Sequence, residues 1–238
     1  TNQRDRDSFE FLLKDGKQLG INIDYIIQPY PEGIAQSFIL AEDFIGNFPV
    51  ALILGDNLFH ANDLGKRLKK NSKIQKGASI FGYSVKDPAK YGVIDFSKDG
   101  KICSIEEKPT KPLSNWIVTG LYFYDSSVVQ KAKSIKPSER GELEITDINK
   151  LYLKEESLRV ERLGRGVTWL DTGTFDSLYE ANSFVRTIQY SQSLKIGCPE
   201  EVAWRNGWIK DNDLIKTGKS IPKSGYGDYL LNLVRSTN

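Results

Sequence analysis

The 238-residue sequence has no methionine, a single histidine, His60, and only two cysteines, Cys103 and Cys198. Because the cysteines are far apart and have no companions at metal-ligand spacing, neither a disulfide framework nor a zinc site is expected. One histidine without a nucleophile-elbow motif argues against Ser-His-Asp and Cys-His hydrolase mechanisms. The missing methionine, and an opening that reads as the middle of a fold, predict that the natural N-terminus lies before Thr1.

Long apolar runs and blocks of one charge are also missing. No run approaches the roughly 18 apolar residues of a membrane-spanning helix, and the first residues lack the apolar stretch of a signal peptide. We therefore expect no membrane segment and a cytoplasmic location. The 33 basic and 31 acidic residues are interspersed and give a formal net charge of +2, so the sequence carries no nucleic-acid footprint.

The first elements predict a βαβ unit. Residues 21–27 are rich in β-branched and aromatic side chains and precede Pro29, Pro31 and Gly33, as at the end of a strand. An apolar stripe at helical spacing over residues 34–45 ends at Gly46. Residues 50–54 form a continuous apolar run, which is typical of a strand buried on both faces of a parallel sheet. We therefore expect a mostly parallel sheet.

The later elements predict an antiparallel insertion, further α/β structure and a helical tail. Strands at short spacing, with a turn at Asp99-Gly100, are expected at residues 78–85, 92–96, 102–107 and 117–124. Helices are expected up to residue 135 and at 145–154 and 175–192, and strands at 158–163 and 167–170. After Pro199, short helices are expected at 200–206, 212–216 and 226–234.

These patterns divide the chain into a main α/β domain, residues 1–198, and a helical appendage, residues 199–238. The main domain is expected to hold a mostly parallel mixed sheet flanked by helices. The appendage carries four aromatic side chains that serve either a subunit interface or a small core of their own: Trp204, Trp208, Tyr226 and Tyr229.

Two acidic residues follow predicted strands and are candidate metal ligands. Asp56 comes after residues 50–54, and Asp171 directly follows the strand expected at 167–170. Ligands bind outside the carboxyl ends of strands in open α/β sheets, so the two carboxylates could meet at one sheet edge and hold Mg²⁺. The alternative is that each Asp only forms a turn or caps a helix.

A second polar cluster ends another predicted strand. Glu107 could accept hydrogen bonds from sugar hydroxyls, and Lys108 could supply a point charge to a phosphate. The alternative is a solvated, charged strand end without a chemical role.

Six motifs occur in the order found in one known family. They are Leu54-Gly55-Asp56-Asn57, Tyr91-Gly92-Val93, Glu106-Glu107-Lys108-Pro109, Val118-Thr119-Gly120-Leu121-Tyr122-Phe123-Tyr124, Arg140-Gly141-Glu142-Leu143-Glu144-Ile145-Thr146-Asp147 and Trp169-Leu170-Asp171-Thr172-Gly173-Thr174. With these motifs the chain, from about Phe9 to Tyr229, resembles the glucose-1-phosphate thymidylyltransferases, a group of sugar nucleotidylyltransferases. The resemblance implies a mononucleotide-binding, Rossmann-like sheet and synthesis of dTDP-glucose from dTTP and glucose 1-phosphate. It also implies a Mg²⁺-dependent in-line attack and a homotetramer.

The resemblance also implies a role for individual residues. Gln28 and Gly33 fall where the family reads thymine, and Asp56 and Asp171 fall where it binds magnesium. Lys108 falls where the family holds the sugar phosphate, and the hexose is held at the positions of Tyr91, Gly92, Glu107 and Val118. Together with the two aspartates, Lys108 is expected to carry the catalysis.

Two expectations concern the limits of the resemblance. The Gly-rich loop that embraces the triphosphate in this family would lie before Thr1, so we expect no measurable pyrophosphate release by this chain alone. The alternatives are a uridylyl- or cytidylyltransferase on the same scaffold, or a non-catalytic sugar-nucleotide-binding subunit.

Overall fold

The computed structural model describes residues 1–221 and 225–236, which form two compact units. The sheet unit is Tyr30–Ser183, and the terminal unit combines Thr1–Pro29 with Phe184–Asn238. The sequence places a boundary between residues 198 and 199 instead. The difference arises because the N-terminal residues pack with the C-terminal helices, a long-range contact that no local pattern signals.

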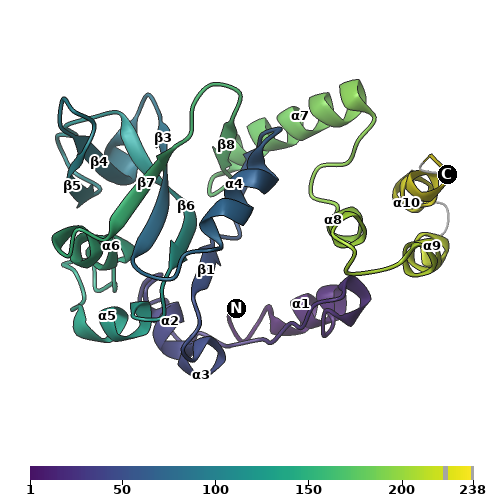
Figure 1. Cartoon of the computed structure of the whole chain (residues 1–238), viewed down its shortest axis with the longest axis horizontal. Helices are drawn as coiled ribbons and strands as arrows, with labels where there is room; N and C mark the ends of the chain where they lie inside the picture. The colour runs from purple at the N-terminus through teal and green to yellow at the C-terminus, as the bar shows by residue number, and fades with distance from the viewer. Residues whose placement is uncertain (222–224, 237–238) are drawn as a thin grey trace. The chain divides into compact units, whose positions relative to one another are not determined.

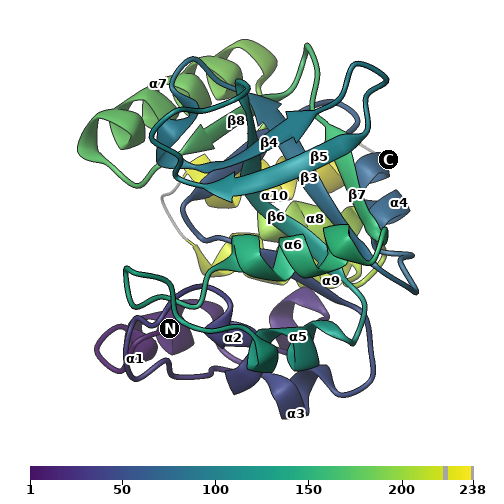
Figure 2. The same ribbon diagram turned by 90° about the vertical axis from the view of Figure 1, so that its left-hand side faces the viewer.

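The sheet unit contains a six-stranded sheet (Figures 1 and 2). Its strand order is β5-β4-β6-β3-β7, and β1 also pairs with β6. The strands are β1 Val50–Ile53, β3 Ala78–Ser84, β4 Gly92–Phe96, β5 Ile102–Glu107, β6 Trp116–Tyr124 and β7 Leu158–Arg162. A second, two-stranded antiparallel sheet pairs β2, Asn57–His60, with β8, Thr168–Asp171.

The expectation of a mixed α/β sheet flanked by helices is confirmed, but the sheet is not mostly parallel. Only β3 and β7 form a parallel pair within the described residues, whereas β6 is antiparallel to β1, β3 and β4. The two strands β1 and β3 therefore run in the same direction without being hydrogen-bonded neighbours, because β6 lies between them. The antiparallel hairpin of β4 and β5 around Gly100 is confirmed, with Gly100 at φ +85°.

Helices of the sheet unit cover the sheet and build its core. They are α2 Gln36–Leu40, α3 Glu42–Ile45, α4 Leu64–Asn71, α5 Val128–Ser134 and α6 Ile145–Lys154, together with the 3-10 turn η2 Pro88–Lys90. Figure 2 shows α6 across the sheet, with α5 next to α2. The fully buried ring of Tyr124 packs edge-on against Phe38 at 5.4 Å and stacks on Tyr152 at 5.5 Å. The Tyr124 hydroxyl donates to Asn149 Oδ1 at 2.7 Å, so both of these buried oxygen atoms have a hydrogen-bond partner.

The terminal unit is helical and has its own core. It contains α1 Arg6–Leu13, η1 Lys17–Leu19, α8 Pro199–Arg205, α9 Asp211–Ser220 and α10 Gly225–Arg235, and α7, Phe175–Gln192, runs into it from the sheet unit. Leu19, Leu214 and Leu230 are buried together in this core. Trp204, Tyr226 and Tyr229 pack against the core, while Trp208 is 53% exposed. Of the two possibilities for the tail aromatics, these three side chains therefore support a small core of their own.

Several local predictions were wrong. Residues 21–27 form no strand: the Ile21 and Ile23 N–H groups donate to the turn at residues 15–16, and the Thr1 ammonium group donates to the Ile26 carbonyl oxygen. The helix expected at 34–45 is split into α2 and α3 at Ala41. Residues 50–53 form β1, but Ile53 is 60% exposed, so this strand is not buried on both faces.

None of the helices in residues 1–221 and 225–236 is long and apolar enough to cross a membrane.

Candidate active site

The small sheet of β2 and β8 brings Asp56 and Asp171 together. Asp56 directly precedes β2 and Asp171 ends β8, and the register places Asn57 opposite Asp171. Thr172 reinforces this pairing, because both its backbone N–H and its hydroxyl donate to the Asp56 carbonyl oxygen, each at 2.8 Å. The two aspartates are 115 positions apart in the sequence but are neighbours in the fold, as the metal-site prediction requires.

The two carboxylates converge on one point beside Gly173. A Cβ atom added to Gly173 would lie 3.1 Å from Asp171 Oδ1 and 3.7 Å from Asp56 Oδ2. The Gly173 backbone N–H also donates to Asp171 Oδ1 at 3.0 Å. Within residues 1–221 and 225–236 no group of three or more His, Cys, Asp or Glu side chains is placed to hold a metal ion. The site therefore offers two carboxylates, which suits Mg²⁺, an ion that usually keeps waters and substrate phosphates in its other positions.

Asn57 holds Asp56 in place, a role that the sequence did not predict. Asn57 Oδ1 accepts hydrogen bonds from the Gly120 backbone at 2.9 Å and from Trp169 Nε1 at 2.6 Å. Since both of these partners are donors, the amide oxygen must face them and the Nδ2 group must face away. Asn57 Nδ2 donates to Asp56 Oδ1 at 2.8 Å, which fixes the direction of that carboxylate.

Tyr91 supports the second carboxylate. Burial raises the pKa of the Tyr91 hydroxyl, and the nearby negative charge of Asp171 raises it further, so the hydroxyl keeps its proton beside that carboxylate. The Tyr91 ring meets Trp169 edge-on at 5.5 Å, and the indole of Trp169 is buried. Trp169 thus contacts both Asn57, which lies beside Asp56, and Tyr91, which lies beside Asp171.

Removing the Tyr91 hydroxyl is expected to weaken divalent-cation binding. Tyr91→Phe should raise the Kd for Mn²⁺ about tenfold, because loss of a group that supports a metal ligand typically costs roughly 10- to 100-fold. Tyr83→Phe is the matched control, since Tyr83 packs on the same indole but donates to the Val167 carbonyl oxygen. Mn²⁺ titration followed by electron paramagnetic resonance measures both variants. Equal Mn²⁺ affinities of the two variants would mean that the Tyr91 hydroxyl does not support cation binding.

A cavity of about 220 Å³ opens beside the carboxylates. It is lined by seven of the nine residues predicted from the sequence: Asp56, Tyr91, Gly92, Glu107, Lys108, Val118 and Asp171. They meet because β4 and β5 place Gly92 opposite Glu107, while Val118 lies on the adjacent strand β6. The Thr146 hydroxyl donates to Glu107 Oε2, which leaves the rest of that carboxylate for a ligand.

Lys108 leaves the β5 ladder with an unusual backbone. Its φ of +42° lies in the left-handed region that non-glycine residues rarely adopt. The Lys108 backbone N–H donates to the Tyr91 carbonyl oxygen at 3.0 Å, and this bond ties the turn to the residue before β4. The strained turn therefore directs Lys108 to the cavity, and strain of this kind gathers at functional sites.

Arg140 adds a cation that the sequence did not identify. It lines the cavity, and its Nε lies 3.3 Å from Glu144 Oε1. Glu144 is buried at the start of α6 and also accepts a bond from the Ser138 hydroxyl at 2.8 Å. Arg140 belongs to one of the six family motifs, and that was the only signal in the sequence that could have found it.

Gln28 and Gly33, the two predicted thymine-binding residues, do not line this cavity. Gly33 has φ +101°, and a Cβ atom on it would lie 2.4 Å from the Leu143 carbonyl oxygen. A glycine is therefore required there by close backbone approach. Gln28 belongs to the terminal unit, where its N–H donates to the Thr1 carbonyl oxygen at 2.8 Å. Their role in base recognition stays a prediction.

Comparison with known proteins relates the chain to one group of enzymes. Residues 1–188 match the family model described as Nucleotidyl transferase. The glucose-1-phosphate thymidylyltransferase of Neisseria meningitidis is 51% identical over 235 residues, which are 99% of this chain and 82% of that protein. The enzyme of the same name from Mycolicibacterium smegmatis is 51% identical over 234 residues, 98% of this chain and 81% of that protein.

The fold of this chain resembles those of solved structures. A Bacillus anthracis protein, described as a candidate glucose-1-phosphate thymidylyltransferase in complex with a sucrose, superposes with a TM-score of 0.73 at 38% identity, covering 84% of this chain and 78% of its own. A UDP-glucose pyrophosphorylase complexed with UDP-glucose gives a TM-score of 0.64 at 24% identity and covers 78% of each chain. At that identity, the second similarity concerns the fold alone.

Proposed function

The chain belongs to the nucleotidyl transferase family, and we propose that it transfers a thymidylyl group from dTTP to glucose 1-phosphate, releasing pyrophosphate. The observation that carries the proposal is the convergence of Asp56 and Asp171 beside a cavity that also holds Lys108 and Arg140. Relatives at about half identity over nearly the whole chain, all named for this reaction, support the choice of substrates.

The chemistry asks the protein mainly to position two polyanions and to neutralise their charge. A sugar-phosphate oxygen attacks the α-phosphorus of dTTP in line, and the bond to the pyrophosphate oxygen breaks with its electron pair going to pyrophosphate. Because a phosphate monoester is already ionised near neutral pH, no general base is needed. Asp56 and Asp171 would hold Mg²⁺, which when bound neutralises charge on the nucleotide phosphates.

The cavity residues divide the remaining tasks by their chemistry. Lys108 and Arg140 are the cations suited to the sugar phosphate, and Glu107 is an acceptor for sugar hydroxyls. Gly92 leaves room for the hexose, since a Cβ atom there would lie 3.0 Å from Thr146 Oγ1 and 3.3 Å from Glu107 Oε2. The proposal further includes Tyr91 and Val118 beside the hexose, Gln28 and Gly33 at the base, a homotetrameric assembly and a cytoplasmic location.

The test is pyrophosphate release in a coupled assay with dTTP, UTP or CTP. It is run on this chain and on a chimera that completes the chain to the length of its Neisseria meningitidis relative with that relative's own residues. We expect Mg²⁺-dependent turnover of the chimera with dTTP and glucose 1-phosphate, and none when EDTA is added. Faster turnover with UTP or CTP would favour the other base specificities. Binding of dTDP-glucose without turnover would favour a non-catalytic subunit.

Lys108→Ala is expected to weaken binding of glucose 1-phosphate more than binding of dTTP. A charge-assisted hydrogen bond contributes roughly 1.5–3 kcal/mol, so we expect KM of the chimera for the sugar phosphate to rise at least about tenfold. Lys111→Ala is the control, because Lys111 is an exposed cation three positions further on that does not line the cavity. A larger effect on KM for dTTP would contradict this prediction and indicate that Lys108 binds the nucleotide.

A further inference from the structure

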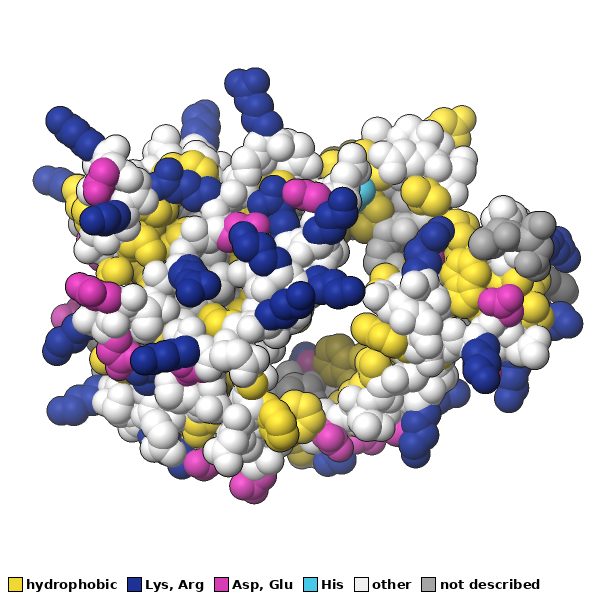
Figure 3. Space-filling view, in the orientation of Figure 1, with side chains coloured by type: hydrophobic (Ala, Val, Ile, Leu, Met, Phe, Trp, Pro, Cys, Tyr) yellow, Lys and Arg dark blue, Asp and Glu magenta, His cyan; other side chains and the backbone are white. Residues whose placement is uncertain are grey.

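The cavity beside Asp56 and Asp171 is lined by more acidic than basic side chains. Five carboxylates line it against three cations, Lys90, Lys108 and Arg140. The whole chain has a formal net charge of +2, and Figure 3 shows many Lys and Arg side chains on the visible face of the sheet unit. The excess of acid is therefore a local property of this cavity. A phosphate that enters it meets carboxylates as well as cations, so the binding of each cation to its own carboxylates matters.

Arg140 is held between two of these carboxylates. Its Nε lies 3.3 Å from Glu144 Oε1, and its Nη2 donates to Glu142 Oε2. Burial lowers the pKa of the Arg140 guanidinium, but the charges of Glu144 and Glu142 outweigh burial, so the pKa is raised. The guanidinium proposed for the sugar phosphate is therefore already engaged at two of its nitrogen atoms.

The two carboxylates differ in their exposure to water. The Glu144 side chain is 8% exposed and also accepts a hydrogen bond from the Ser138 hydroxyl, whereas the Glu142 side chain is 39% exposed. A buried carboxylate that loses its cation is left with an uncompensated charge, but a carboxylate near the surface is solvated by water instead. Glu144 is therefore the permanent partner of Arg140, and Glu142 is the partner that a ligand can replace.

The backbone around Glu142 allows its side chain to move alone. The Ser138 N–H donates to the Glu142 carbonyl oxygen at 2.9 Å, and the Gly141 N–H donates to the Ser138 carbonyl oxygen at 2.8 Å. These two bonds close a turn over residues 138–142. Since half-exposed side chains change rotamer rapidly, the Glu142 carboxylate can leave Arg140 while the turn stays closed.

We infer that Glu142 occupies on Arg140 the place that the phosphate of the sugar phosphate takes, and that it thereby sets the affinity of the site for phosphates. The inference rests on the proposed function and makes Glu142 a positioning residue that acts through Arg140. Phosphate oxygens replace Glu142 Oε2 at Nη2, and Glu142 turns to water. Glu144 keeps Nε in place, so the guanidinium remains oriented throughout the exchange.

Displacement of Glu142 costs the same free energy for every phosphate, so it weakens all of them by one factor. Glucose 1-phosphate gains affinity from its hexose, for which Glu107 is the proposed acceptor. Inorganic phosphate has no such group. Glu142 therefore lowers occupation of the site by inorganic phosphate and leaves a ligand with further contacts able to bind.

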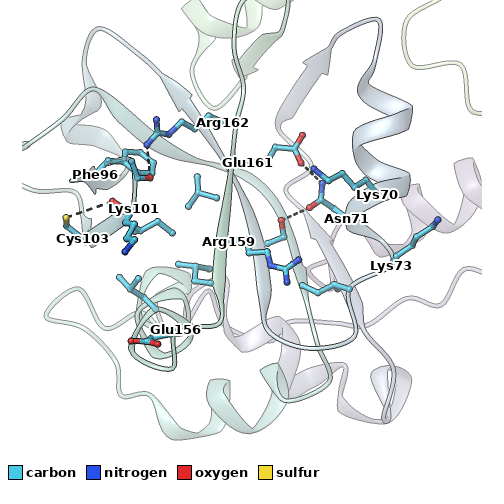
Figure 4. A pocket seen from close by; sticks show the side chains of 17 residues that line it. Lys70, Asn71, Lys73, Phe96, Lys101, Cys103, Glu156, Arg159, Glu161 and Arg162 are labelled. Atoms are coloured by element: carbon cyan, nitrogen blue, oxygen red, sulfur yellow. Dashed lines mark hydrogen bonds between the residues drawn. The ribbon is translucent and has the colours of Figure 1, made fainter. Parts of the chain in front are cut away.

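A second, larger cavity of the sheet unit is also lined by cations, and phosphate bound there has to be distinguished. It measures about 1290 Å³ and shares no lining residue with the cavity at Arg140. Figure 4 shows β7 running through it, with Phe96 and Arg162 on one side of the strand and Glu161 on the other. Arg159, an exposed cation of this larger cavity, provides the control for phosphate bound away from Arg140.

The test measures the Kd of the chain and of the chimera for glucose 1-phosphate and for inorganic phosphate by phosphorus NMR titration. Glu142→Gln should tighten both ligands by the same factor, about threefold, because a partly exposed ion pair contributes at most a few-fold in affinity. A change that only disturbed the turn would weaken binding, so a gain of affinity distinguishes the two explanations.

Two variants serve as controls for Glu142→Gln. Glu139→Gln removes the same charge from the same turn, but Glu139 is exposed and does not line the cavity. Glu139→Gln and Arg159→Gln should both leave the two affinities unchanged. An equal gain of affinity in Glu139→Gln would contradict the inference, because the effect would then come from the net charge of the chain.

A double-mutant cycle tests whether Glu142 acts through Arg140. In the Arg140→Gln background, Glu142→Gln should lose most of its effect, whereas in the Lys108→Gln background it should keep it. An undiminished effect without Arg140 would show that Glu142 repels the phosphate directly and would exclude the inferred role. Tightening of glucose 1-phosphate without tightening of inorganic phosphate would also exclude it, since Glu142 would then act on the hexose.

The same measurements separate the role of Glu142 from the proposed substrate. If inorganic phosphate shows the expected changes but glucose 1-phosphate binds no more tightly than inorganic phosphate, Glu142 keeps its role and the proposed substrate is wrong. Turnover of glucose 1-phosphate by the chimera, with unchanged affinities in Glu142→Gln, would retain the proposed function and overturn the role of Glu142. Failure of both ligands to bind the chain, the chimera and their Glu142→Gln variants would overturn both.

Discussion

Asp171→Asn is expected to lower Mn²⁺ affinity by at least about tenfold, and turnover of the chimera by the same factor, because losing a metal ligand typically costs roughly 10- to 100-fold. The change removes the negative charge at Oδ1, the oxygen that lies beside Gly173 and opposite Asp56. An asparagine oxygen in the same place can still accept the Gly173 N–H, so the local fold should be preserved. Electron paramagnetic resonance of Mn²⁺ measures the affinity, and pyrophosphate release measures turnover.

Asp176→Asn provides the control for this prediction. Asp176 is an exposed aspartate in the first turn of α7, five positions beyond Asp171, and it does not line the cavity. Both variants lose one negative charge on the same segment, so long-range electrostatics change similarly. Wild-type Mn²⁺ affinity in Asp171→Asn, or an equal loss in Asp176→Asn, would exclude Asp171 as a ligand. Lost turnover with unchanged Mn²⁺ affinity would instead place Asp171 in contact with substrate.

The sequence predicted the elements whose signals are local. The helices at 145–154 and 175–192 and the strands at 92–96 and 102–107 have the expected bounds, because apolar periodicity and a turn signal such as Asp99-Gly100 act over a few residues. Residues 21–27 have a strand-like composition, but a strand exists only with a neighbour. Composition cannot show whether that neighbour is present, so this prediction was wrong.

The candidate site shows the same division between local and long-range information. Asp56, Asp171, Glu107 and Lys108 could be named because each lies at or directly after the end of a recognisable strand. Asn57 could not, since its role depends on Gly120 and Trp169, which are 63 and 112 positions away. Thr146 contacts Glu107 across 39 positions for a similar reason. Apart from Arg140, the charged side chains that the proposed function uses were found from the sequence, and the side chains that orient them required the fold.

The network around Asn57 depends on a glycine, and Gly120→Ala is expected to disrupt it. A Cβ atom on Gly120 would lie 2.7 Å from both Cγ and Oδ1 of Asn57 and 2.8 Å from Cγ of Leu54. Distances below 3.0 Å require something to move, and Asn57 is held from its other side by Trp169. We expect a loss of about 1–3 kcal/mol in the free energy of unfolding, the typical cost of overpacking a core. Urea denaturation of the purified chain measures it.

Gly120→Ala should also weaken Mn²⁺ binding. This second effect distinguishes it from a substitution that only destabilises the fold. If Asn57 shifts, its Nδ2 group no longer directs Asp56 Oδ1, so Mn²⁺ affinity should fall about tenfold. Gly82→Ala on β3 is the control, because its Cβ atom would lie 3.1 Å from Val160 Cγ1 and 3.3 Å from Ile94 Cδ1, the ends of side chains that do not touch Asn57. Gly82→Ala should therefore reduce stability without changing Mn²⁺ affinity. Equal Mn²⁺ affinities in the two variants would mean that Asp56 is oriented without Asn57, since of the two glycines only Gly120 donates to the Asn57 amide.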